Sequence, residues 1–291
     1  MVKSFLDINA KKTDIFLKKY LNRQSHSNLM SAMKYGSLSG GKKIRSSIIM
    51  GTGKLFDINN SKLLNLCGAV ECIHSYSLIH DDLPCMDNDR MRRGKLATHV
   101  KFGESTAILA GNSLLTLAFE MIVDKSYKIE SKTKTELIRA LALCSGHTGI
   151  AGGQYLDLSF EKKKKKFSDI LNMQRKKTGK LFNFCCFAPG VIAKKKFGDL
   201  KSLSKLGEDI GLLFQLADDF IDFSGSKKLA GKSTKKDQKK GKSTLISLMG
   251  YQKANSYALR LKKNILSKLQ KHGKKANDLI NTVEFILKRN F

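Results

Sequence analysis

The chain has 291 residues, of which 41% are hydrophobic, so it can bury a large core and is too apolar to be a disordered protein. Its 54 Lys and Arg exceed its 25 Asp and Glu, and the formal net charge is +29. A charge of this size indicates an anionic partner, unless the lysines, which lie in short scattered runs, simply form a solvated surface.

Apolar residues recur at three- and four-residue spacing along most of the chain, and we find no sustained alternation typical of strands. In chain order, the pattern predicts helices over residues 2–23, 43–56, 60–82, 104–125, 133–150, 165–188, 197–224, 243–248, 251–270 and 274–289. Only two prolines, Pro84 and Pro189, interrupt the chain, which also favours helix. We therefore expect a single all-α domain over residues 1–291, packed as a large helical bundle.

Neither a membrane-spanning segment nor a secretion signal is predicted. The longest nearly apolar run, residues 181–193, is shorter than the ~20 residues that a spanning helix needs. The first residues lack the apolar core of a signal peptide, so we expect a cytoplasmic protein without stable membrane insertion. The six cysteines lack the spacing of metal sites and receive no chemical role; Cys185 and Cys186 are expected in the core.

The predicted helix over residues 60–82 ends in an unusually polar run. Asp81 and Asp82 are adjacent, so they repel each other, and the helix C-terminus is the negative pole of the helix dipole. A hard divalent cation would relieve both effects. Pro84 forces the chain out of the helix and turns Asp87 back towards the same opening, while His74 shares a helical face with Asp81.

A second acidic cluster lies in the predicted helix over residues 197–224. Asp218 and Asp222 are four residues apart and project from one face, yet apolar residues flank them. Buried carboxylates must be paired or bound to metal. One such motif is common on solvated helices, but two in apolar helices together favour a metal site. Mg²⁺ fits best, because it prefers carboxylates completed by substrate phosphates.

Cationic groups complete a site for anions. Lys42, Lys43 and Arg45 open a predicted helix, whose first N–H groups are free to bind an anion. Further cations follow each acidic cluster or lie between the two, namely Arg92, Arg93, Lys177, Lys180, Lys232 and Lys242. Each alone is explained by a solvated surface, but together they describe a site for two diphosphates bridged by magnesium.

These residues lie in strings that resemble a known family. GGKKIR, ECIHSYSLIHDDLPCMDNDRMRRG, GGQYLD, KTGKLF, FQLADDFID and GKSTKKDQKKGKSTL occur in the order and at the spacing of the trans-prenyl diphosphate synthases. The resemblance is strongest to the bacterial farnesyl diphosphate synthases and covers essentially the whole chain.

The resemblance implies an all-α isoprenoid synthase fold around a central cavity, in a homodimer. It implies three magnesium ions, with manganese as an alternative, held by Asp81, Asp82, Asp87, Asp218 and Asp222. The allylic diphosphate would contact Arg92, Lys177, Thr178, Gln215 and Lys232, and isopentenyl diphosphate would contact Lys42, Arg45, His74 and Arg93. The catalytic groups would be Asp81, Asp82, Asp87, Arg92, Lys177 and Asp218. In the implied reaction the allylic C–O bond ionises, the isopentenyl double bond attacks the cation, and the released pyrophosphate takes the proton.

Product length is expected to depend on Tyr76. It lies five residues before Asp81, or about 7–8 Å down the helix, where its ring would block a growing chain, whereas the neighbouring Ser77 would not. In the resembled family, an aromatic residue here, with a two-residue insertion in the first acidic motif, is typical of farnesyl diphosphate synthases. Simple core packing of Tyr76 is the alternative.

The chain departs from the family pattern at several positions. Lys43 stands where arginine is common and Ser46 where proline follows, while Asn88 replaces an acid. Lys236 replaces a glycine, and Thr-Leu-Ile at 244–246 replaces Thr-Tyr-Pro. None of these changes removes an expected ligand. They leave the conformation of the 225–245 loop, and with it the placement of Lys232, open.

Other functions are weighed against the same residues. A geranylgeranyl or geranyl diphosphate synthase is the nearest alternative. A terpene cyclase is disfavoured because the second motif has three aspartates and GGKKIR with His74 is present. A basic nucleic-acid-binding protein would need interleaved aromatics, which are missing, and an inactive subunit would have lost aspartates. We expect no nucleic-acid partner.

Overall fold

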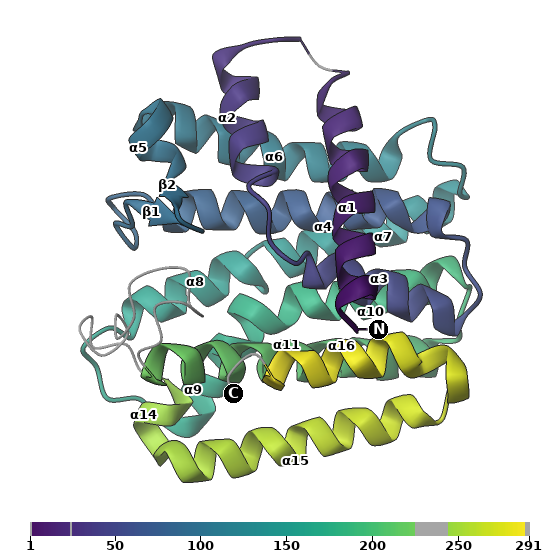
Figure 1. Cartoon of the computed structure of the whole chain (residues 1–291), viewed down its shortest axis with the longest axis vertical. Helices are drawn as coiled ribbons and strands as arrows, with labels where there is room; N and C mark the ends of the chain where they lie inside the picture. Colours follow the sequence, from purple (N-terminus) through teal and green to yellow (C-terminus); the bar gives the residue numbers. More distant parts are fainter. Residues whose placement is uncertain (1, 24, 225–243, 289–291) are drawn as a thin grey trace.

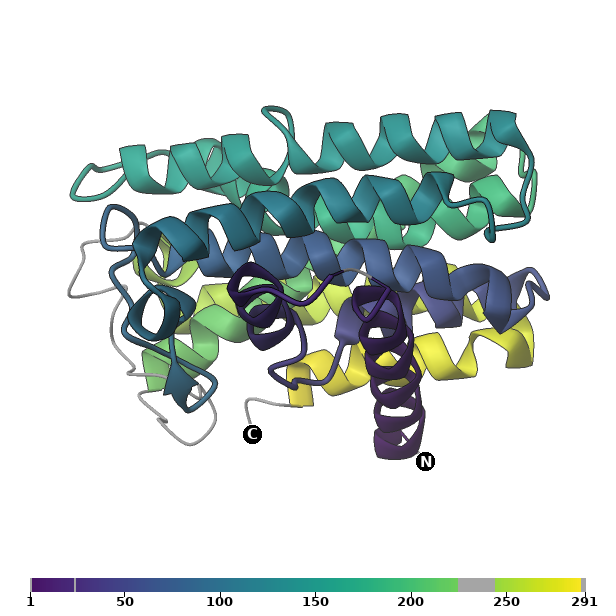
Figure 2. The same cartoon turned by 90° about the horizontal axis from the view of Figure 1, so that it is seen from above.

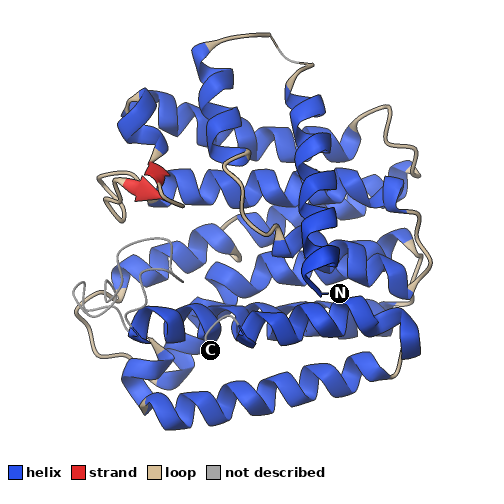
Figure 3. Ribbon diagram, viewed as in Figure 1, coloured by secondary structure: helices blue, strands red, loops and turns tan. Residues whose placement is uncertain are grey.

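The computed structural model describes residues 2–23, 25–224 and 244–288. Within these ranges the chain is almost entirely helical, as predicted (Figures 1 and 3). The helices are α1 (Val2–Leu21), α2 (Asn28–Ser37), α3 (Ile44–Leu55), α4 (Asn60–Asp81), α5 (Thr98–Phe102), α6 (Glu104–Val123), α7 (Ser131–Ser145), α8 (Ile150–Ser159), α9 (Phe167–Gln174), α10 (Lys180–Ile192), α11 (Phe197–Ser224), α14 (Leu245–Met249), α15 (Tyr251–Gln270) and α16 (Asn277–Lys288). A π-helical turn, η1 (Arg175–Gly179), joins α9 to α10, and a 3₁₀ turn, η2 (Gly273–Ala276), precedes α16.

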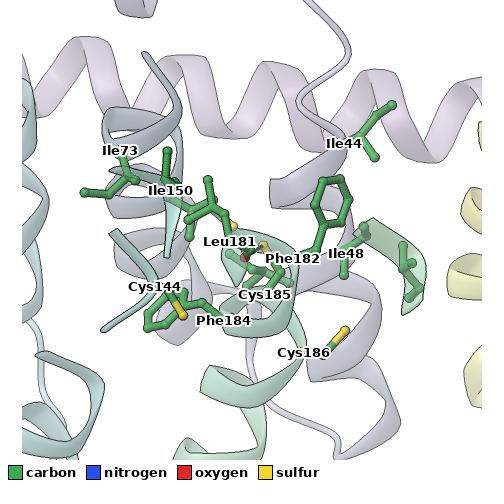
Figure 4. Packing of buried hydrophobic residues seen from close by; sticks show 14 of the residues in the cluster. Ile44, Ile48, Ile73, Cys144, Ile150, Leu181, Phe182, Phe184, Cys185 and Cys186 are labelled. Carbon is green, nitrogen blue, oxygen red and sulfur yellow. Dashed lines mark hydrogen bonds between the residues drawn. The ribbon is translucent and has the colours of Figure 1, made fainter. Parts of the chain in front are cut away.

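The helices form a layered bundle in which α1 and α2 run across the direction of the others (Figures 1 and 2). The pair α4 and α6 and the pair α10 and α11 pack most extensively, and α3 packs on both α4 and α10. The buried apolar side chains form one cluster that reaches from α1 to α16. Figure 4 shows its centre, where Phe182 of α10 lies near Ile44 and Ile48 of α3. This packing fixes α3, α4, α10 and α11, the helices that carry most of the predicted site.

Cys185 and Cys186 are fully buried in this core, as expected (Figure 4). Burial raises the pKa of the Cys186 thiol to about 12, and it raises the pKa of the Cys185 thiol well above its usual value. A thiol that stays protonated is a weak nucleophile. The structure therefore supports a packing role for both residues.

Several element boundaries differ from the prediction. The sequence pattern missed α2, α5 and α8, and it missed a two-stranded hairpin in which β1 (Met91–Arg92) pairs with β2 (Lys95–Leu96). The glycines at 152 and 153 have low helix propensity. In α8 they nevertheless allow the helix to pack closely against neighbouring backbone, that of His147 at Gly152 and that of Lys177 at Gly153. The predicted end at residue 188 is also wrong, since α10 continues through Pro189 to Ile192. Proline lacks a backbone N–H and so removes a single helical hydrogen bond, and the helix ends within one turn of it.

The expectation that no helix is apolar enough to cross a membrane is corrected for α6, which passes that test by length and composition. A search for uninterrupted apolar runs missed it because isolated Ser, Thr, Asn and Gly residues divide its apolar positions. The core helix of a soluble protein passes the same test. In this structure 44% of the apolar window is buried, and the helix packs along α4.

Candidate active site

The first acidic cluster lies where α4 ends and the chain folds back on itself. Asp82 caps the helix, and the N–H of Asp87 donates to the Asp81 carbonyl at 2.8 Å. The N–H of Asp89 likewise donates to the Asp82 carbonyl at 3.1 Å. These bonds satisfy the last carbonyls of the helix. They bring Asp87 back beside Asp81, as the position of Pro84 predicts.

Asp82 is paired with Arg92 of the hairpin. The Arg92 Nε donates to both carboxylate oxygens of Asp82, at 3.1 and 3.2 Å, and its Nη2 forms a further bond to Oδ1. Burial alone would lower the pKa of the Arg92 guanidinium, but the hydrogen bond and charge of Asp82 outweigh it and raise the pKa. The predicted metal ligand Asp82 and the predicted diphosphate ligand Arg92 therefore lie against each other. The sequence did not predict this pair.

The π-helical turn η1 carries Lys177 and Thr178 into contact with two other helices. A side chain at Gly153 of α8 would lie 2.1 Å from the Lys177 backbone nitrogen, and one at Gly211 of α11 would lie 2.7 Å from the Gly179 Cα. Glycine at these positions thus lets α8, η1 and α11 approach at backbone distance. π-Helical turns are frequent at functional sites, because the extra residue redirects side chains.

Two hydrogen bonds fix the side chains of this turn. Lys177 Nζ donates to Asp157 Oδ2 of α8 at 2.6 Å, and Thr178 Oγ1 donates to Gln215 Oε1 of α11 at 2.7 Å. Gln215 Nε2 in turn donates to Asp219 Oδ1 at 2.8 Å. The buried carboxylate of Asp219 therefore orients Gln215, which orients Thr178.

Asp218 and Asp222 of the second acidic cluster are partly exposed on α11, in contrast to the buried Asp219. The ends of α4 and α11 that carry the two clusters point to the same side of the molecule, at the left of Figures 1 and 2. Among the described residues, no three His, Cys, Asp or Glu side chains lie close enough to hold a metal ion by themselves. The donor set is nevertheless all oxygen, which fits Mg²⁺ held by few carboxylates and completed by substrate oxygens.

Lys42 and Arg45 leave the start of α3 towards different aromatic rings. The Lys42 Nζ lies 4.1 Å from the ring centre of Phe285, and the Arg45 Cζ lies 4.8 Å from Phe182 and 5.5 Å from Phe214. Burial lowers the pKa of Arg45, and the charges of nearby carboxylates, Asp218 among them, oppose this. Arg45 thus links α3 electrostatically to the second acidic cluster.

Arg93 of the hairpin closes over the loop that precedes α3. Its Nη1 donates to Ser39 Oγ at 3.2 Å and to the Gly40 carbonyl. Gly41 has a φ of +100°, which favours glycine, and a side chain there would lie 2.9 Å from the Arg93 Cζ and displace that guanidinium. Burial, followed by the charges of Arg45 and Arg93, lowers the pKa of His74 well below its usual value. His74, Arg45 and Arg93 therefore form one group, with His74 neutral at pH 7.

Tyr76 lies on the side of α4 that faces α6. Its ring packs edge-on against His80 with 5.6 Å between centroids, and His80 Nε2 lies 3.1 Å from the Ile108 carbonyl of α6. Burial raises the pKa of Tyr76, as does the charge of Asp81. Ser77 donates back to the His74 carbonyl at 2.9 Å. The bulky ring of Tyr76 is thus held below the first acidic cluster.

A family model described as polyprenyl synthetase matches residues 26–283 of this chain. The chain belongs to the polyprenyl synthetase family.

Curated relatives and solved structures agree with this family. The farnesyl diphosphate synthase of Escherichia coli (strain K12) is 39% identical over 267 residues, which make up 90% of this chain and 89% of that protein. An apo FPP/GFPP synthase from Zymomonas mobilis superposes with a TM-score of 0.89 and 34% identity over 98% of both chains. A geranyltransferase from Helicobacter pylori, complexed with magnesium and isoprenyl diphosphate, gives a TM-score of 0.83 and 31% identity over 99% of this chain and 96% of that chain. The predicted isoprenoid synthase fold class is confirmed.

Some residues of this polyprenyl synthetase family member that received no predicted role lie beside the predicted site residues. Asp157 binds Lys177, and the buried amide of Gln174 donates to Asp219 at 2.9 Å. Both polar atoms of the Gln154 amide are buried and lack a hydrogen-bond partner in the part of the chain that the structure describes. The GGQYLD string contained the signal for Gln154 and Asp157, but spacing alone did not assign them. The predicted ligand Lys232 lies outside the described residues.

Proposed function

We propose that this chain condenses isopentenyl diphosphate with dimethylallyl or geranyl diphosphate, head to tail (1'-4), to give farnesyl diphosphate and pyrophosphate. One observation carries the proposal: the ends of α4 and α11, which carry the two acidic clusters, point to the same side of the bundle (Figure 1), and two separate sets of cations accompany these clusters. One set, Arg92 and Lys177, fits an allylic diphosphate, and the other, Lys42, Arg45 and Arg93 with His74, fits isopentenyl diphosphate. The similarity to farnesyl diphosphate synthase of Escherichia coli supports the same reaction.

The residues act by binding, orienting and stabilising charge. Lys177, held by Asp157, presents its other N–H donors to the allylic diphosphate. Thr178 gives its only hydroxyl proton to Gln215, so it reaches the diphosphate once that hydroxyl turns. Arg92 reaches the same group from the hairpin. Preorganised donors stabilise the negative charge that develops on a leaving group, so the allylic C1–O bond breaks to give pyrophosphate and a carbocation.

Arg45, Arg93 and Lys42 hold isopentenyl diphosphate so that its double bond meets this cation. The new C–C bond forms from the double bond, and one proton then leaves the condensed product for the released pyrophosphate. The neutral state of His74 suits a hydrogen-bonding rather than a charge-pairing role there.

We propose Asp81, Asp82, Asp87, Asp218 and Asp222 as the magnesium ligands, for three ions, with manganese as a substitute. Magnesium supplies the positive charge that the departing pyrophosphate needs. Asp82 joins the set once Arg92 turns from it to the diphosphate, since the two now pair with each other. The Helicobacter pylori relative was solved with magnesium and isoprenyl diphosphate, which supports this assignment.

We propose Tyr76 as the residue that limits the product to fifteen carbons. It is 9% exposed, and His80 and the helix α6 hold its ring in place. A longer product would need this ring to move. Geranylgeranyl diphosphate remains the second candidate product, and the relative from Zymomonas mobilis, whose name includes two products, shows why length must be measured.

We propose that the protein is a cytoplasmic homodimer of one catalytic domain over residues 1–291. The exposed side of α6 carries Ile108, Leu109 and Val123, which are 41%, 55% and 49% exposed, and Leu143 of α7 is 48% exposed. Exposed apolar patches of this kind mark protein interfaces. A second copy would cover the patch, which also accounts for the membrane-like composition of α6.

A product assay tests the reaction. Purified protein receives isopentenyl diphosphate and geranyl diphosphate, with and without magnesium, and chain length is determined by chromatography. We expect a fifteen-carbon product that disappears with EDTA and returns with Mg²⁺, and that is lost in Asp218→Asn but not in Asp199→Asn of the same helix. Absence of any condensation would contradict the proposal. Salt-sensitive binding of RNA that survives Asp218→Asn would favour the nucleic-acid alternative.

A further inference from the structure

The three cations at the start of α3 point in three directions. Lys42 and Arg45 extend to aromatic rings, whereas Lys43 turns into the protein and is 6% exposed. The Lys43 backbone adopts a left-handed conformation with a φ of 43°, which is unusual for a residue with a side chain. This conformation directs the side chain of Lys43 inward while those of its neighbours remain at the site.

Lys43 joins three helices. Its Nζ donates to the Ser37 carbonyl of α2 at 2.8 Å, and it lies 3.4 Å from Asp14 Oδ1 of α1 and 3.7 Å from Glu71 Oε2 of α4. The last of these carboxylates is 2% exposed. A charge at that depth costs several kcal/mol unless it is paired and hydrogen-bonded. Glu71 meets that condition, because its other oxygen accepts from Ser46 Oγ of α3 at 2.9 Å.

Glu71 also lies among the cations of the site. It is one turn before His74 on α4 and therefore on the same face. Removal from water lowers the pKa of both Arg45 and Arg93, and Glu71 is the first charge that opposes this for each of them. Arg93 in turn holds the loop at Ser39 and Gly40, which lies directly between α2 and Lys43. The charge of one carboxylate thus acts on cations at both sides of the predicted isopentenyl diphosphate site.

We propose that Glu71 is a positioning residue for the isopentenyl diphosphate site: through Lys43 and Ser46 it fixes the first turn of α3, and so sets Lys42, Arg45 and Arg93 for the substrate. The inference rests on the proposed function and adds a residue that binds no substrate itself.

The proposal also explains two departures from the family pattern. Where arginine and proline are common, this chain has Lys43 and Ser46, and both make contacts to Glu71. Lysine is a compact point charge, so it fits between two carboxylates and a carbonyl without the flat fork of a guanidinium. A serine hydroxyl supplies the hydrogen bond that a proline could not. The two changes therefore act together on one buried carboxylate.

The test uses Glu71→Gln and Ser46→Ala in the full-length protein with magnesium. We expect Glu71→Gln to raise both the KM and the calorimetric Kd for isopentenyl diphosphate about tenfold, while the KM for geranyl diphosphate stays within about twofold. Ser46→Ala removes one hydrogen bond without unpairing a charge, so it should shift the same two constants about threefold. It keeps the test valid if Glu71→Gln does not fold, which circular dichroism reports.

Asp124→Asn is the matched control. At the C-terminal end of α6, Asp124 Oδ2 accepts from the Tyr20 hydroxyl at 2.8 Å and from Arg23 Nη1 at 3.1 Å. The variant should therefore be less stable, while the KM values for isopentenyl diphosphate and geranyl diphosphate stay unchanged. Unchanged isopentenyl constants in the folded variants, or an equal rise of both KM values, would overturn the proposal. Because the calorimetric titration needs no turnover, a wild type that binds isopentenyl diphosphate but does not condense it would contradict the proposed function alone.

Discussion

Tyr76 and Asp82 illustrate what single residues contribute. Tyr76 has no charge to offer the site, and its effect depends on the volume of a ring that is held between α4 and α6. Asp82 has a charge, but Arg92 of the hairpin already balances it. Both residues could be named from their spacing to Asp81. Their partners could not, because His80–α6 packing and the β1–β2 hairpin are tertiary features.

Tyr76→Ala should lengthen the product. Removal of the ring opens space below the acidic cluster, so we expect products of twenty carbons or more, at a cost in stability of ~3–5 kcal/mol typical of aromatic truncation. Chromatography of the dephosphorylated products measures the change. The matched control Tyr76→Phe keeps the ring and should keep the fifteen-carbon product. A fifteen-carbon product from both variants would mean that Tyr76 only packs the core.

At the scale of elements, the long amphipathic helices were predictable and the short connecting ones were not. The predicted ranges for α3, α4, α6 and α11 agree with the structure within a few residues at each end. The π-helical turn η1 was not predictable, since nothing in its sequence RKKTG distinguishes a π-turn from an α-helix. It arises from the close approach of α8 and α11, and such an approach is decided by glycines far away in the sequence.

Gly153→Ala should separate α8 from η1. The added carbon would lie 2.1 Å from the backbone nitrogen of Lys177, and backbone cannot move aside cheaply. We expect a loss of ~1–3 kcal/mol in the free energy of unfolding, typical of overpacking, and a strong fall in kcat because the Lys177–Asp157 bond is displaced. Urea unfolding and steady-state assays measure both.

Gly198→Ala on α11 is the control for that substitution, because among the described residues no atom outside the adjoining backbone of α11 lies within 4 Å of the added carbon. It should leave activity unchanged and stabilise slightly, as alanine favours helix. Equal behaviour of the two variants would contradict the packing argument.

At the scale of the whole molecule, the outer faces differ in character. The exposed side of α6 carries three large apolar side chains among polar ones, while α15 at the opposite edge of Figure 1 carries five basic residues and no acidic ones. The sequence predicted the all-α class and the family, because periodicity and motif spacing are local properties. The sequence did not predict which side of each helix is exposed. The composition of α6, for example, is that of a membrane span, and it does not reveal that the helix packs along α4.

Leu109→Glu should convert the proposed dimer into a monomer. Leu109 is 55% exposed on α6, and a carboxylate buried there against a second copy would be unpaired. Light scattering coupled to size-exclusion chromatography measures the mass. Leu259→Glu, a substitution of a 49% exposed leucine on α15, should leave the mass unchanged. A wild-type monomer would contradict the expectation directly.

The π-helical turn has a consequence for how this chain tolerates length changes. A one-residue deletion within Arg175–Gly179 would let the backbone relax into an ordinary α-helix and keep α9 and α10 continuous. Because the wide turn already absorbs the extra residue, the helices on either side would keep nearly the same phase, and only the side chains within the turn would take new directions. The fold would survive, but Lys177 and Thr178 could no longer face Asp157 and Gln215 together. Insertions and deletions should therefore abolish activity more readily in this segment than elsewhere in the chain.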